Sequence, residues 1–204
     1  MTTFWNWGRR LAEFGPPVTG HAEPTAAPDE LSIDAEGWLR GAGVQIVESV
    51  RHSRLTTAQG PIAIVWHYTA TAQGTAKNLA NRIRSYKRGV DRAASWHVCI
   101  GSDGVLWQSV PFLRGSWHCA KGLIDGHRVN ACTVGIELEG HGKLFPVEQA
   151  VAAERLVIAL AETYGIRQAH AAHGHVDFDP KRRTDPGLIW SQEILPGILE
   201  RAYT

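Results

Sequence analysis

A histidine and an aspartate stand ten residues apart, His175 and Asp185, in the segment His-Val-Asp-Phe-Asp-Pro-Lys-Arg-Arg-Thr-Asp-Pro-Gly. Neutral imidazole and carboxylate both ligate borderline divalent ions, zinc among them. The Pro-Gly pair directly after Asp185 is typical of a sharp turn, which could bring the carboxylate back toward His175. We therefore interpret this segment as part of a metal site.

A third candidate ligand, His67, follows the apolar run Pro-Ile-Ala-Ile-Val-Trp. Such a run is typical of a buried central strand, and His67 falls where that strand should give way to a loop. Catalytic zinc sites keep one position open beside three protein ligands, whereas structural sites are closed by four, so three ligands favour a catalytic site. Rival ligands remain open at this stage, namely His173 and the thiols of Cys119 and Cys132.

Composition limits the size of the protein and its partners. The 204 residues suffice for one domain with a sizeable core. A formal net charge of +1 produces no overall field for nucleic acid or an anionic membrane, so we expect neither as a partner. Three cysteines in a chain of this size favour free, buried thiols. Because no stretch approaches the roughly 18 apolar residues of a membrane span, we expect a soluble protein. We also expect it to be a monomer.

Residues 1–35 differ in composition from the rest of the chain. They comprise an aromatic and basic segment, with Phe4, Trp5 and Trp7, and a Pro- and Ala-rich linker over about residues 15–31. Glu13 and a Gly-Pro-Pro sequence interrupt the segment behind its arginine pair, so we do not interpret it as an export signal and expect synthesis in the cytoplasm. We expect it to pack back on a domain that spans residues 36–204.

The remaining sequence predicts a mixed α/β fold, with a mixed central sheet flanked by helices. Apolar or alternating stretches predict strands at residues 61–67, 95–100, 105–110, 133–139 and 169–176, the last carrying His175. Capping signals and periodicity predict helices at residues 75–89, 146–164 and 194–203, the last interrupted early by Pro196. Alternation along 133–139 places Glu137 and Glu139 on the same face of their strand.

Five motifs in order resemble the zinc-dependent N-acetylmuramoyl-L-alanine amidases, the superfamily of type-2 amidases and peptidoglycan recognition proteins. The motifs are His67-Tyr-Thr-Ala-Thr, Ala-Ser-Trp-His97, Ser-Trp117-His118, Asn130-Ala-Cys-Thr-Val-Gly-Ile-Glu137-Leu-Glu-Gly, and His175 through Asp185-Pro-Gly. The match runs from about residue 60 to 190. It implies a single domain with zinc in a surface groove, which hydrolyses the amide between muramic acid and L-alanine of the peptide stem.

Residue by residue, the resemblance implies His67, His175 and Asp185 as zinc ligands, and its spacing favours His175 over His173. Glu137 matches the acid/base glutamate of the family, which would take a proton from water and return it to the leaving nitrogen. Arg183 stands where many relatives of this type have lysine. Arginine keeps the positive charge near a developing oxyanion but cannot transfer a proton, and Arg182 or Lys181 could compensate.

Further residues of these motifs are expected to contact the substrate, namely His97, Trp117, His118 and Asn130. For His97 a place in the core remains equally open. The expected substrate is peptidoglycan or a muropeptide. The sequence leans toward a phage endolysin that acts on the cell wall, and a cytosolic amidase that recycles anhydromuropeptides is the alternative. A non-catalytic peptidoglycan-binding module and a hydrolase of another amide are also open, although the complete set of ligands argues against the binding module.

Overall fold

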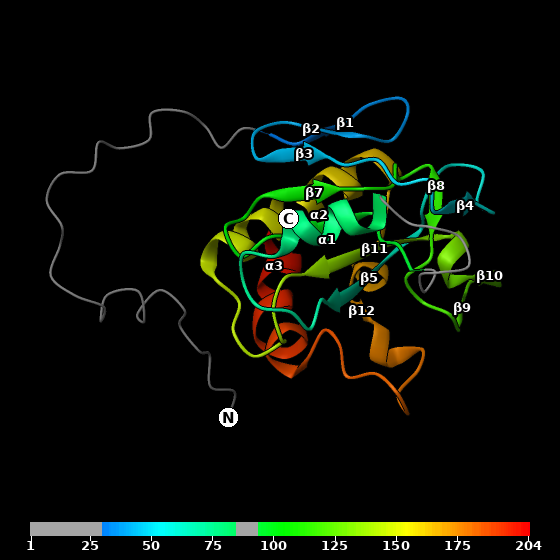
Figure 1. The fold of residues 1–204 in the computed structure, drawn as a ribbon. Helices are drawn as coiled ribbons and strands as arrows, with labels where there is room; N and C mark the ends of the chain where they lie inside the picture. Colours follow the sequence, from blue (N-terminus) through cyan, green and yellow to red (C-terminus); the bar gives the residue numbers. More distant parts are fainter. Residues whose placement is uncertain (1–29, 85–93) are drawn as a thin grey trace, which may run out of the picture.

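The computed structural model describes residues 30–84 and 94–204 (Figure 1). The aromatic and basic segment and the end of the predicted 75–89 helix, with its capping residue Gly89, lie outside the described residues. The packed body includes Leu31 in its core and begins with strand β1 (Ser32–Ile33). The folded domain thus extends to the N-terminal side of residue 36, where the composition alone placed its start.

A mixed six-stranded sheet forms the centre of the molecule. Its order is β12 (His173–Gly174), β5 (Ala63–Tyr68), β11 (Thr133–Leu138), β6 (Val98–Ile100), β7 (Leu106–Gln108) and β3 (Val44–Ile46). Neighbouring strands run parallel except for β6 and β7, the antiparallel hairpin predicted from the Asp-Gly turn. The central strand β5 is fully buried over Ala63–Trp66, as its apolar run predicted.

One face of the sheet packs against two helices, α2 (Val147–Tyr164) and α3 (Leu195–Ala202). The large side chains of this main core include Trp66 of β5 and Leu156 and Leu160 of α2. Pro146 is the N-cap of α2, and Gly165 ends the helix with a positive φ of 65°, a conformation that costs glycine little. The predicted helix over 146–164 is therefore confirmed.

The opposite face of the sheet carries a smaller core and the helix α1 (Ala76–Arg84). Ala63 and Val65 of β5 pack there with Cys119 and Cys132. Glu139, at the end of β11, accepts hydrogen bonds from the backbone N–H groups of Thr75 and Ala76, so a carboxylate from the sheet caps α1. Side chains of β5 and β11 alternate between the two faces, and His67 and Glu137 belong to the same set as Ala63 and Val65.

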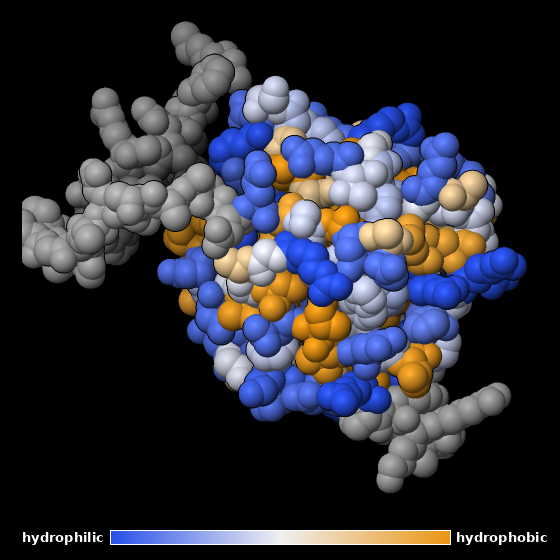
Figure 2. Space-filling model, turned by 90° about the horizontal axis from the view of Figure 1, so that it is seen from above, coloured by the Kyte–Doolittle hydropathy of each residue, from blue (hydrophilic) through white to orange (hydrophobic). Residues whose placement is uncertain are grey.

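Short two-stranded sheets and tight turns complete the fold. The strands pair as β1 with β2 (Leu39–Arg40), β4 (His52–Arg54) with β8 (Arg114–Ser116), and β9 (Leu123–Ile124) with β10 (His127–Arg128). Tight 3₁₀ turns cover Val129–Ala131, Gln168–Ala171 and His175–Asp177, and a π-helical turn covers Ile189–Ile194. Seen from above in Figure 2, hydrophilic residues cover most of the surface and hydrophobic ones form small separate groups.

Two predictions about the C-terminal third need correction. The strand expected over 169–176 is reduced to β12, and His175 is the first residue of the 3₁₀ turn that follows it. Pro196 does not end the last helix: it lies in the first turn of α3, directly after the π-helical turn, and the helix continues to Ala202. Within the described part of the chain, no helix combines the length and apolarity that crossing a membrane requires.

Candidate metal centre and active site

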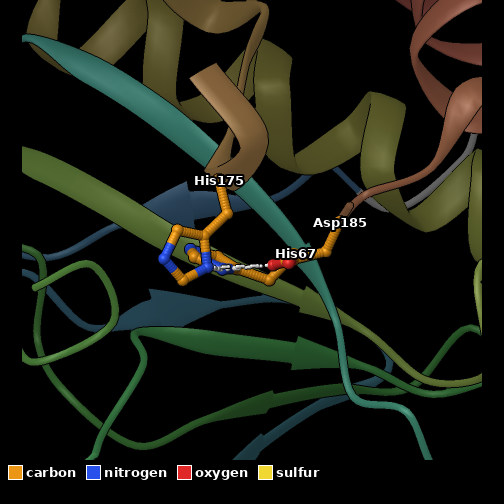
Figure 3. A group of neighbouring side chains, drawn as sticks. All are labelled: His67, His175 and Asp185. Carbon is orange, nitrogen blue, oxygen red and sulfur yellow. Dashed lines mark hydrogen bonds and ion pairs between the residues drawn. The ribbon is translucent and has the colours of Figure 1, made fainter. Parts of the chain in front are cut away.

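Three side chains from distant parts of the chain meet at one end of β5 (Figure 3). The Nδ1 atom of His67 lies 2.9 Å from Oδ2 of Asp185 and 3.0 Å from Nδ1 of His175. The third side of this triangle, from Nδ1 of His175 to Oδ2 of Asp185, also measures 3.0 Å. All three residues are buried, with 2%, 3% and 6% of their surface exposed for His67, His175 and Asp185. The structure thus brings together the three ligands that the sequence predicted.

The charges of this cluster fit a bound cation. Burial alone would raise the pKa of Asp185, but the contacts of its carboxylate with His175 and His67 outweigh burial and hold that pKa below its ordinary value. Burial lowers the pKa of His67, which favours the neutral ring that a metal requires. For His175 the bond to Asp185 outweighs burial and raises the pKa to about 9, so this ring favours its protonated form in the absence of a cation. Two nitrogens and one carboxylate suit a borderline divalent ion such as zinc.

The rival thiols have protein partners and stand outside the group of side chains that could hold a metal. The thiol of Cys119 donates to the carbonyl of Lys121 and also interacts with His175, and that of Cys132 donates to the carbonyl of Val129. All three cysteines are free and buried, as predicted. Over residues 30–84 and 94–204, the one group of three or more histidine, cysteine and acidic side chains close enough to hold a metal is the His67, His175 and Asp185 cluster.

The cluster borders a pocket of about 110 Å³. Since a water molecule takes up roughly 30 Å³, the pocket has room for a small reacting group, and the rest of a larger ligand must extend over the surface around it. Besides the three candidate ligands, the lining consists of Tyr68, Ala94, Ser95, Trp96, Trp117, His118, Glu137 and Arg183. The rings of Tyr68, Trp96 and Trp117 and the titratable groups of His118, Glu137 and Arg183 thus border the candidate metal centre.

Glu137 reaches the pocket from the central strand β11, where it pairs in register with His67 of β5. Its Oε2 atom is buried without a hydrogen-bond partner among the described residues. Burial, followed by the negative charge of Asp185, raises the pKa of Glu137 to about 8. A carboxyl group with that pKa can both take up and release a proton near neutral pH, which is the property of a general acid and base.

Arg183 provides positive charge at the rim of the same pocket. Its guanidinium charge adds to the lowering of the pKa of His67 and opposes the rise in the pKa of Glu137. In both cases burial and closer groups act more strongly. The two basic residues before it in the chain, Lys181 and Arg182, do not line the pocket. Arg182 donates its Nε–H to Asp179 at 2.6 Å, and Lys181 is exposed. Compensation by these two residues, which the sequence left open, therefore has no support in the geometry.

His97 and Asn130, both expected to contact the substrate, lie outside the lining of the pocket. His97 is fully buried, where its Nε2–H donates to the carbonyl of Arg114 and its Nδ1 accepts from Ser116 and from the backbone of Gly135. His97 does not line the pocket, so the geometry gives no support to its predicted substrate contact and agrees with the place in the core that the sequence left open. Asn130 also lies outside the lining.

The side chain of Asn130 holds the loop that carries the pocket residues Trp117 and His118. Its Oδ1 accepts the backbone N–H groups of His118 and Cys119 at 3.1 and 2.6 Å. Trp117 lines the pocket as expected. His118 also lines it, but both ring nitrogens have protein partners, with Nδ1 2.9 Å from Nε2 of His67 and Nε2 3.0 Å from Oγ1 of Thr133.

The sequence reasoning missed two aromatic residues of the pocket wall, Tyr68 and Trp96. The indole N–H of Trp96 is buried without a partner among the described residues, and the hydroxyl of Tyr68 is 2.8 Å from that of Thr184. Both residues are direct neighbours of motif histidines, Tyr68 of His67 and Trp96 of His97. That adjacency within the motifs was the available signal.

Comparison with known proteins assigns the chain to a family. Residues 57–188 match the family described as N-acetylmuramoyl-L-alanine amidase. A 1,6-anhydro-N-acetylmuramyl-L-alanine amidase AmpD of Enterobacter cloacae is 38% identical over 105 residues, which cover 49% of this chain and 55% of that protein. In that alignment the chain spans little more than half of its relative. The AmpD protein of Citrobacter freundii is 34% identical over 164 residues, covering 74% of this chain and 87% of that protein.

Solved structures agree with the assignment. The crystal structure of a selenomethionine AmpD derivative superposes with a TM-score of 0.64 at 26% identity, covering 84% of this chain and 99% of that one. A mutant endolysin from Bacillus subtilis (21% identity, TM-score 0.56, 76% and 97% covered) and the Drosophila peptidoglycan recognition protein SA (19%, 0.55, 71% and 86%) share the fold. The match over residues 57–188 and the likeness to the Citrobacter protein place this chain in the N-acetylmuramoyl-L-alanine amidase family.

Proposed function

We propose that the protein is a zinc-dependent amidase that hydrolyses the bond between N-acetylmuramic acid and L-alanine in peptidoglycan or its fragments. One observation carries the proposal. The acceptor atoms of His67, His175 and Asp185 lie within 3.0 Å of one another, in the same pocket as the unpartnered carboxyl group of Glu137. Family membership indicates which amide such a site would cut.

Each residue then has a chemical task. His67, His175 and Asp185 would hold zinc, which when bound supplies a Lewis acid that polarises a carbonyl group and acidifies water. Glu137 takes a proton from the attacking water and passes it to the leaving nitrogen of L-alanine, which cannot depart as an anion. Arg183 provides positive charge for the oxygen that becomes negative in the tetrahedral intermediate. Arginine does this without donating a proton.

The form of the substrate follows from the relatives. Both AmpD proteins are named for 1,6-anhydro-N-acetylmuramyl substrates, whereas the endolysins resemble this chain in fold alone. Of the two settings that the sequence left open, this pattern supports the recycling of soluble anhydromuropeptides over lysis of the intact wall. We therefore propose soluble 1,6-anhydromuropeptides as the preferred substrates, with intact peptidoglycan as the second candidate.

An assay on both substrate classes tests the proposal. Purified sacculi and soluble 1,6-anhydromuropeptides are incubated with the zinc-loaded protein, and products are separated by chromatography and identified by mass. The expected result is release of the free stem peptide from the soluble fragments, abolished by a chelator and restored by zinc. Faster release from sacculi would favour the endolysin-like function. Tight binding of muropeptide by the zinc-loaded protein without any release would identify a recognition module instead.

A further inference from the structure

A line of hydrogen bonds runs from the candidate ligand His67 into the smaller core. Nε2 of His67 lies 2.9 Å from Nδ1 of His118, and Nε2 of His118 lies 3.0 Å from Oγ1 of Thr133. Thr133 in turn donates its hydroxyl proton to the carbonyl oxygen of Val129 at 2.8 Å.

The direction of every bond in this line is set from its inner end. A carbonyl oxygen can only accept a hydrogen bond, so Thr133 donates its one hydroxyl proton to the carbonyl of Val129. Its Oγ1 must then accept a hydrogen bond from His118. His118 then carries its proton on Nε2 and presents a lone pair at Nδ1. That lone pair accepts the Nε2–H of His67. A neutral His67 is therefore left with its lone pair on Nδ1, the atom that faces His175 and Asp185.

The position of His118 is itself fixed by its surroundings. Asn130 holds its backbone N–H, as described above. Its ring packs directly over Gly135 of β11, where a Cβ atom would overlap the imidazole carbons. The ring of His67 meets it edge-on, with centroids 5.1 Å apart and an interplanar angle of 84°. These contacts come from three different segments, so the acceptor at Nδ1 of His118 is held in place independently of any metal.

We propose that His118 is a positioning residue for the metal centre. It fixes the tautomer and the ring orientation of His67, so that Nδ1 of His67 is ready to ligate before the ion arrives. The inference rests on the proposed zinc function and deepens it. Partners of this kind behind a metal ligand typically change metal affinity by about 10–100-fold when they are removed. His118 was expected to contact the substrate, and the geometry points to this different task.

The test compares variants that separate the two ring nitrogens of His118. His118→Asn keeps an acceptor oxygen near the place of Nδ1, whereas His118→Leu removes both polar atoms. Zinc affinity is measured by competition with a chromogenic chelator, and the visible spectrum of the cobalt-substituted protein reports ligand geometry. His127→Leu provides a matched control, since His127 bonds to Thr56 on the surface and lies outside the line. Thermal unfolding of the metal-free proteins checks that each variant folds.

The expected result is a zinc affinity about 10–100-fold weaker for His118→Leu, with an altered cobalt spectrum. Most of the affinity should return in His118→Asn, and His127→Leu should match the parent protein. If the parent binds zinc and His118→Leu binds it equally well, the positioning role is wrong while the proposed function stands. If Asn and Leu lower affinity equally, the acceptor at Nδ1 is not the cause and the proposal also fails. A parent protein that binds no zinc would overturn both proposals.

Discussion

Glu137 and His67 are direct partners in the register of the two central parallel strands, β11 and β5. Because side chains alternate along a strand, this pairing places the candidate base and a candidate ligand on the same face and in adjacent strands. Their separation is therefore set by the hydrogen bonding of the sheet rather than by a loop. A slip of one residue between the strands would turn one of them into the main core, which the packing of Trp66 and Ile136 opposes.

Replacing Glu137 by glutamine tests its role in proton transfer. The amide is close in shape to the carboxyl group but cannot take up or release a proton at neutral pH. We expect kcat to fall by about 10²–10⁴-fold, while the zinc content per protein stays at that of the parent, as measured by metal analysis. Loss of zinc together with activity would mean that Glu137 supports the metal site instead of the proton transfer.

Substitutions of Arg183 distinguish charge from shape. Arg183→Ala removes the positive charge at the pocket rim and is expected to lower kcat by about 10²–10³-fold, the usual effect of losing one group that stabilises the oxyanion. Arg183→Lys restores the charge and should recover most of that loss. Steady-state kinetics on the same muropeptide provide the comparison. Equal activity of the Ala and parent proteins would exclude Arg183 from the reaction.

Replacing Gly135 by alanine tests the packing against the ring of His118. A methyl group at this position would overlap the His118 ring, which is held by hydrogen bonds at both of its nitrogens. We expect Gly135→Ala to lower the free energy of unfolding by about 1–3 kcal/mol, measured by denaturant titration. Gly197→Ala in α3 is the control, because its Cβ would meet only the end of the Arg201 side chain. Alanine favours the helical conformation, so the free energy of unfolding should rise by about 0.5–1 kcal/mol. A stable Gly135→Ala protein would contradict the crowding described here.

His97 predicts how stability depends on pH. Burial lowers the pKa of His97 to about 4. Between pH 6.5 and 4, this imidazole is therefore protonated in the unfolded chain but stays neutral in the folded protein. This contribution to stability is complete above pH 6.5 and is lost as the pH falls toward 4, by up to about 3 kcal/mol. Denaturant unfolding of the metal-free protein at several pH values should show a shallower dependence in His97→Gln. Parallel curves for the two proteins would mean that His97 makes no such contribution.

The sequence predicted best those features that depend on local pattern. The apolar run before His67 and the alternation around Glu137 specify buried strands by themselves, and motif order identified His175 and Asp185. The roles of His97 and Asn130 depend on segments that the fold brings to them, namely the backbone of Arg114 and Gly135 for the former and the loop at His118 for the latter. No spacing in the chain encodes those contacts. A polar residue in a motif therefore signals importance without showing whether it faces the substrate or the interior.

The three candidate ligands are far apart in the chain, since His67 precedes His175 by 108 residues and Asp185 by 118. During synthesis, His67 is therefore added to the chain well before His175 and Asp185. The candidate metal site is consequently incomplete until Asp185 has been synthesised and β12 has joined the sheet beside β5.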